Sequence, residues 1–177
     1  AVLVALTLAC ALALRRNAAV PATNDGSVPI APPVSVAVLC GPITARRRAR
    51  WVCLAFVPSS LMLGVTTYLT ADIAAVPLLW VLPLALYLVT FILAFGGRAL
   101  PLAGLARALP ILLVGLAMVF TLRATQPVTM IVLLHLAAFF VAALLCHGEL
   151  GRDRPAAEHL TGFYLWLSVG GVLGGVF

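Results

Sequence analysis

The stretch PVTMIVLLHLAAFFVAALLC, residues 127–146, contains no aspartate, glutamate, lysine or arginine. A bilayer core of about 30 Å needs about 20 apolar residues in an α-helix. Backbone amides in lipid must bond internally, which leaves helices or closed barrels, and this stretch lacks the alternation of a barrel strand. It therefore predicts a transmembrane helix and, with the similar runs around it, an all-α fold.

Further apolar runs flank this stretch, at residues 1–14, 51–71, 76–95, 108–122 and 160–177. Hydrophobic residues make up 64% of the 177-residue chain and charged residues only 9%, whereas a soluble domain is about a quarter charged. The runs predict a polytopic transmembrane bundle of about six spans or partial spans. At about 1.5 Å per residue the first run is too short to cross a bilayer. We therefore expect 1–16 to be the end of a transmembrane helix, and the chain to be a fragment that is truncated at its C-terminus.

The basic residues predict the orientation of this bundle. All eleven are arginine, and ten of them lie in the segments 15–50, 96–107 and 147–159, leaving only Arg123 elsewhere. The positive-inside rule places these three segments in the cytoplasm as loops. The net charge of +6 could suit nucleic acid, but arginines that flank apolar runs form no single basic face. We therefore expect the lipid bilayer as a partner, and no nucleic acid.

Residues 17–50 contain five prolines without helical periodicity, which predicts a cytoplasmic linker that precedes a multi-helix transmembrane domain over 51–177. The motif RRRARW at 46–51 closes the linker. It is typical of an interfacial anchor, with its arginines at the anionic inner leaflet and Trp51 at headgroup depth.

Hydroxyl-bearing and small residues form a stripe on the run 51–71. Ser60, Gly64 and Thr67 follow helical spacing, and Ser59 lies beside them. Small residues let helices approach closely, so the stripe favours a helix-packing face. The alternative is the lining of a path for a polar substrate.

Two titratable residues are candidates for function inside or beside the spans. Asp72 lies at the end of the run 51–71, where it could be a functional acid, stay hydrated or cap the next helix. His135 lies near the middle of 127–146. Its imidazole could relay protons, but a neutral ring bonded to a serine or threonine of a neighbouring helix is the favoured interpretation.

The motif GGVLGG near the C-terminus contains two small-xxx-small pairs, Gly170 with Gly174 and Gly171 with Gly175. Such pairs form grooves for a partner helix, in the same chain or in a second copy. The spacing differs from that of the dinucleotide fingerprint.

The segment CHGELGRDRPAAEH, residues 146–159, contains several residue types that bind metals. Their spacing suits no helical ligand face and arginines are interleaved, so we expect a solvated cytoplasmic loop. The four cysteines have no CxxC spacing, and no Walker, GxSxG or HExxH motif occurs. We therefore expect no catalytic residue, cofactor or metal in this chain.

Two stretches, LAFVPSSLMLGVTTYLTADIAAVPLLWVLPLALYLVTFILAF at 54–95 and HLAAFFVAALLCHGELGRDRPAAEHLTGFYLWLSVGGVLGG at 135–175, carry a resemblance to a family. They resemble the membrane region of bacterial fused major-facilitator/spermidine-synthase-like proteins, over roughly residues 51–177. In that family a multi-helix membrane part precedes a soluble aminopropyltransferase-like domain, which binds decarboxylated S-adenosylmethionine and a diamine. The glycine-rich motif of that domain has no counterpart in this sequence.

The resemblance implies a multi-pass protein of the bacterial inner membrane that anchors, and supplies substrate to, a synthase domain outside this chain. Helices of the same protein outside the chain are then further partners. One alternative is a small-solute transporter in its own right. Another is a structural assembly partner that packs or self-associates through GGVLGG.

Overall fold

The computed structural model describes residues 44–70, 80–97, 100–123 and 127–176, and these ranges contain helices and no strand. Their five α-helices are α2 (Ala45–Tyr68), α3 (Val81–Phe95), α4 (Leu102–Thr121), α5 (Val128–Arg152) and α6 (Leu160–Val176), with the 3-10 turn η3 (Ala157–His159) before α6. The all-α prediction is confirmed. The described helices number five rather than about six, and the expected helical end at 1–16 lies outside the described residues.

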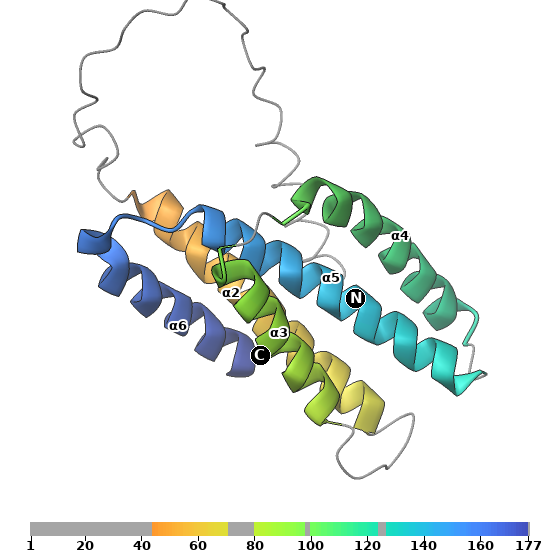
Figure 1. Ribbon diagram of the computed structural model, residues 1–177. Coiled ribbons are helices and arrows are strands. Elements are labelled where there is room, and N and C mark those ends of the chain that lie inside the picture. Colours follow the sequence, from red (N-terminus) through yellow and green to blue (C-terminus); the bar gives the residue numbers. More distant parts are fainter. Residues whose placement is uncertain (1–43, 71–79, 98–99, 124–126, 177) are drawn as a thin grey trace, which may run out of the picture.

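Helix α5 lies at the centre of the bundle. It packs against α2, α3 and α4, whereas α6 packs mainly against α2. Figure 1 shows α4 and α6 on opposite sides of the pair formed by α2 and α5. Two clusters of buried side chains hold this arrangement, one where α2, α5 and α6 meet and one between α4 and α5.

Among the described residues, four helical segments are long and apolar enough to cross a membrane: α2, α4, α5 and the segment Ala157–Val176, which joins η3 to α6. Helix α3 is apolar but has only 15 described residues. The outer surfaces of the bundle are also apolar, as Ile111 and Phe120 of α4 are 73% and 84% exposed. Apolar surface of this extent suits lipid rather than water.

Two helices begin earlier in the sequence than the apolar runs predict. Helix α4 starts at Leu102 rather than at 108, and has 20 residues. Leu102 and Leu109 are buried against α5 while Arg107 is exposed on another face, so the charge does not interrupt the helix. Helix α2 starts at Ala45, with Thr44 as its N-cap. The expected loops 15–50 and 96–107 are therefore partly helical, and residues 17–43 of the linker lie outside the described residues.

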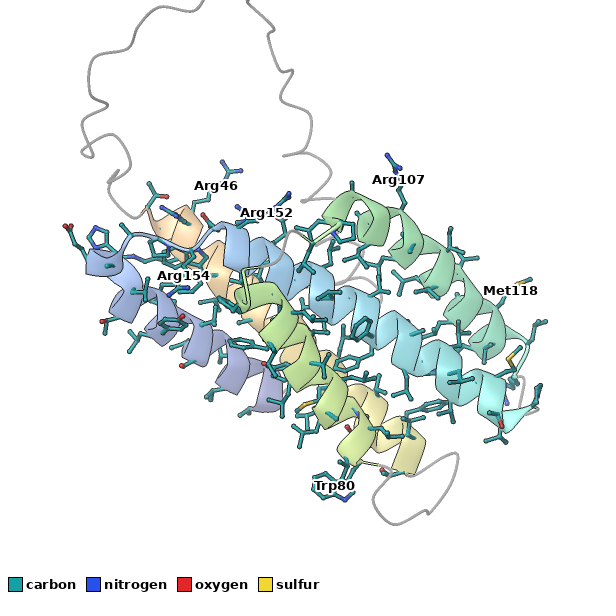
Figure 2. The ribbon with its side chains drawn as sticks, in the orientation of Figure 1. Arg46, Trp80, Arg107, Met118, Arg152 and Arg154 are labelled. Carbon is teal, nitrogen blue, oxygen red and sulfur yellow. The ribbon has the colours of Figure 1, made fainter. Side chains whose placement is uncertain are left out.

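Described arginines from the segments 15–50, 96–107 and 147–159 lie at one end of the bundle. Figure 2 shows Arg46 near the start of α2, Arg107 near the start of α4, and Arg152 and Arg154 at the end of α5. Trp80, which precedes α3, lies at the opposite end. The fold thus brings together arginines from segments far apart in the sequence.

Candidate functional site

Helices α2 and α6 approach each other closely at two glycines. A Cβ atom at Gly170 would collide with a backbone carbonyl of α2 and lie 2.9 Å from the Cβ of Ala55. A Cβ atom at Gly174 would collide with another carbonyl of α2 and lie 2.9 Å from the Cβ of Ser59. Because the α2 backbone supplies the obstructing atoms, a side chain at either position would force the two helices apart.

The other two glycines of GGVLGG have different surroundings. A Cβ atom at Gly171 would be in ordinary contact with the Ser59 hydroxyl, at 3.7 Å, and one at Gly175 would meet no atom within 4 Å. The motif therefore places one glycine pair against α2 of the same chain, one glycine beside Ser59, and one in open space.

A cavity of about 270 Å³ lies beside this contact, between α2, α3, α5 and α6. Its volume is close to the lower end of ligand pockets, which is roughly 300 Å³. Aromatic rings, hydroxyls and one imidazole form most of the lining, and none of the lining residues is acidic. The lining comprises Ala55, Tyr87, Phe91, His147, Leu150, Tyr164, Leu167, Ser168 and Gly171.

His147 corrects the expectation of a solvated loop at 147–159. Helix α5 continues to Arg152, and His147 is only 1% exposed. Phe139, Ala143, His147 and Leu150 are all buried, and their spacings of four, four and three residues place them on one helical face. Residues 142–148 are all buried, so neighbouring helices enclose α5 at His147, and the sequence alone carries no signal of this burial.

The hydrogen bonds around Thr90 assign the tautomer of His147. The Thr90 hydroxyl donates to the carbonyl of Tyr87 at 2.7 Å, and its Oγ1 lies 3.0 Å from His147 Nδ1. A hydroxyl has one proton and a carbonyl can only accept. His147 must therefore donate from Nδ1, which leaves its Nε2 with a lone pair that can accept a hydrogen bond.

Two aromatic rings of α3 hold the same imidazole from its sides. The ring centroids of Tyr87 and Phe91 lie 5.1 Å and 5.2 Å from that of His147, both edge to face. The Tyr87 hydroxyl lies 3.4 Å from the Ser59 hydroxyl of α2. Side chains from three helices therefore position this wall of the cavity.

The predicted hydroxylated stripe of α2 divides into two parts. Ser59 and Ser60 are buried, at 7% and 5% exposure, and Ser59 adjoins the cavity through Tyr87. Thr67 is exposed and Gly64 is half-buried, and neither lines the cavity. Only the part of the stripe that contains Ser59 and Ser60 therefore contributes to the contact with α6 and to the wall of the cavity.

His135 lies apart from the cavity. Its Nδ1 donates to the carbonyl of Ile131 in its own helix at 2.7 Å, and its ring stacks on Tyr68 with centroids 4.6 Å apart. Among the described residues it therefore has no serine or threonine partner on another helix, in contrast to the favoured interpretation of the sequence. Asp72 lies outside the described residues.

An ionic network joins the start of α2 to the end of α5. Asp153 accepts hydrogen bonds from Arg47 Nε at 3.0 Å and from Trp51 Nε1 at 2.8 Å. Arg50 pairs with Glu149 at 2.7 Å. Both acidic side chains are only 18% exposed. These acids therefore bind arginines of the bundle instead of lying in a solvated loop.

Trp51, the expected interfacial residue of the RRRARW motif, is enclosed by protein. It is 0% exposed and packs edge to face on Phe163 of α6, with ring centroids 5.0 Å apart. The guanidinium of Arg47 lies 5.2 Å from the centroid of the same indole. The indole is therefore a packing residue where α2, α5 and α6 meet, because both its ring and its N–H group have partners inside the protein.

Metal-binding residues do not gather in the part of the chain that the structure describes, where no three histidine, cysteine, aspartate or glutamate side chains come together. The candidate site is thus the cavity around His147 rather than a metal centre. No protein family, curated protein or solved structure matches this chain.

Proposed function

We propose that this chain is the membrane-embedded region of a bacterial spermidine-synthase-like fusion protein. In this role it anchors the protein in the inner membrane, and it holds a solute for a soluble aminopropyltransferase-like domain. The resemblance of residues 54–95 and 135–175 supports the family. The observation that carries the solute-binding role is the cavity between α2, α3, α5 and α6.

An anchor alone has no use for such a cavity. Polar groups inside a membrane protein are costly unless they are satisfied, and they commonly mark substrate pathways. The cavity combines apolar walls with a few polar atoms from several helices, which is the usual composition of a small-molecule site. The cavity lies between four helices and opens along α6, where Tyr164 and Ser168 are exposed. This position supports a solute that is held by the membrane region.

The alternative function is a small-solute transporter that works without a synthase domain. The same cavity supports it, because transporters hold their substrates in sites between helices. The two functions differ in the step after the solute binds. A supplying region passes the solute to a catalytic domain, whereas a transporter moves it across the bilayer.

Binding to the full-length protein in lipid nanodiscs tests the proposal. Labelled putrescine and labelled decarboxylated S-adenosylmethionine represent the two substrates of aminopropyl transfer. Gly171→Leu should fill the cavity and weaken binding of the accepted substrate at least about tenfold, because its side chain would extend beside Ser59 into the cavity. Gly175→Leu is the matched control, because open space surrounds that position.

Uptake into proteoliposomes separates the two functions. Binding that depends on Gly171 without accumulation in the vesicles supports supply to a synthase domain. Accumulation by a protein that lacks such a domain supports the transporter. If neither substrate binds, or if Gly171→Leu and Gly175→Leu bind equally well, the proposed supply role is wrong.

A further inference from the structure

Two of the polar side chains that line the cavity, His147 and Ser168, present hydrogen-bond acceptors. Nδ1–H of His147 is used by Thr90, so the imidazole presents the lone pair of Nε2. No described residue bonds this nitrogen, and no buried side-chain nitrogen or oxygen of the described residues lacks a partner. Nε2 is therefore accessible, although His147 as a whole is only 1% exposed. The space next to this nitrogen is the cavity that His147 lines.

Ser168 of α6 presents a second acceptor. Its hydroxyl donates its one proton to the carbonyl of Tyr164 at 2.9 Å, which leaves the oxygen lone pairs available. Ser168 and His147 thus line the same cavity from two helices with their protons already used elsewhere. An occupant that satisfies them must bring its own N–H or O–H donors.

The apolar part of the lining favours a flat ring. Tyr87, Phe91 and Tyr164 contribute aromatic side chains, and aromatic groups prefer edge-to-face or offset contacts with other rings. None of the lining residues is a carboxylate, and an unpaired charge is costly to bury. A cavity of about 270 Å³ also suits a compact ring system better than a long flexible chain.

We infer that the cavity binds an uncharged heteroaromatic ring whose N–H group donates a hydrogen bond to Nε2 of His147. This inference rests on the proposed solute-binding role and specifies the part of the solute that the cavity holds.

The test uses indole and 1-methylindole, which share a ring system and differ in the single N–H donor. Protein labelled with ¹⁵N in its three histidines is placed in nanodiscs, and the ring nitrogens are observed by NMR. His147→Gln assigns the His147 signals. If that variant does not fold, His135→Gln and His159→Gln assign them by elimination.

We expect the free protein to show a protonated Nδ1 and an unprotonated Nε2 at His147. Indole should move the Nε2 signal toward the position of a protonated nitrogen, and 1-methylindole should bind about tenfold more weakly, since it offers no donor. Gly171→Leu should abolish the indole response, and Gly175→Leu should retain it.

Three results would overturn the inference: an unprotonated Nδ1 in the free protein, equal responses to the two indoles, or no response to indole. These results are distinguishable from failure of the proposed function. If putrescine moves the His147 signals and binds in a Gly171-dependent manner while indole does neither, the solute-binding role stands and the ring specificity is wrong.

Discussion

Thr90 of α3 accepts a hydrogen bond from His147 of α5, with Oγ1 and Nδ1 3.0 Å apart, because the Thr90 proton is already donated to Tyr87. Both side chains are buried, at 0% and 1% exposure. This single contact joins two helices and leaves Nε2 of the imidazole as an acceptor. The polarity of the cavity therefore depends on a threonine that does not line it.

Replacing Thr90 tests this relationship. Thr90→Val removes the acceptor and leaves the buried Nδ1–H of His147 without a partner, which should cost about 1–2 kcal/mol of unfolding free energy. Thr90→Ser keeps the hydroxyl, so its unfolding free energy should be close to that of the wild type. Titration of the purified protein with a denaturing detergent measures both. Equal stabilities of the two variants would show that the hydrogen bond contributes little.

The contact between α2 and α6 gives a second prediction. Gly170→Ala and Gly174→Ala should each destabilise the fold by about 1–3 kcal/mol, because the new methyl group would meet the α2 backbone. Alanine also gains up to about 1 kcal/mol of helix propensity over glycine. Gly175→Ala, in open space, measures that gain alone. The packing cost is the difference in unfolding free energy between each of these variants and the Gly175→Ala control, measured in the same titration. If the three variants are equally stable, the close approach of α2 and α6 is contradicted.

The ionic network should couple Arg47 to Asp153. A double-mutant cycle with Arg47→Ala and Asp153→Ala should give a coupling of about 1 kcal/mol, since the side chains are 33% and 18% exposed and solvent screens part of the attraction. Asp153→Ala should be the more harmful single change because it also removes the acceptor of the Trp51 indole N–H. Arg152→Ala, at a position that is 67% exposed and 3.7 Å from Glu149, should change stability by less than about 0.5 kcal/mol. A coupling energy near zero would show that the ion pair between Arg47 and Asp153 does not stabilise the fold.

The arginine-rich end should face the cytoplasm. In a background without the native cysteines, a membrane-impermeant thiol reagent added to intact cells should label Trp80→Cys and leave Glu158→Cys unlabelled until the cells are opened. Both positions are exposed. Trp80 lies at the end of the bundle opposite the arginines, and Glu158 belongs to η3, four residues after Arg154. The opposite labelling pattern would reverse the predicted orientation.

Much of the helical architecture is predictable from local sequence. The run 127–146 largely coincides with α5, and 51–71 and 160–177 each overlap a described helix. Uncharged stretches of this length are helical in lipid because each backbone amide must bond within its own segment. The same logic misplaces helix ends: it puts Arg107 and His147 in loops, yet both are helical. A charged or polar side chain ends an apolar run without ending the helix.

The candidate site is less predictable. Of the residues that the sequence singles out, Gly171 lines the cavity and Ser59 adjoins it, whereas His135 lies apart from it. The sequence pattern assigns His147 to a solvated loop, because a histidine followed by glutamates and arginines resembles a soluble segment when its partners are not known. Its actual partners, Thr90 and Tyr87, are 57 and 60 residues away in the sequence.

The sequence by itself determined the class of this protein: apolar runs of membrane-spanning length make helices, since lipid offers no other partner for the backbone. It also determined which segments carry the arginines. The tertiary structure alone decided which glycines touch α2, that Trp51 faces inward, and that His147 is buried beside a cavity. These features depend on contacts between helices distant in the chain, and helical periodicity defines the faces of each helix without specifying which neighbour each face meets.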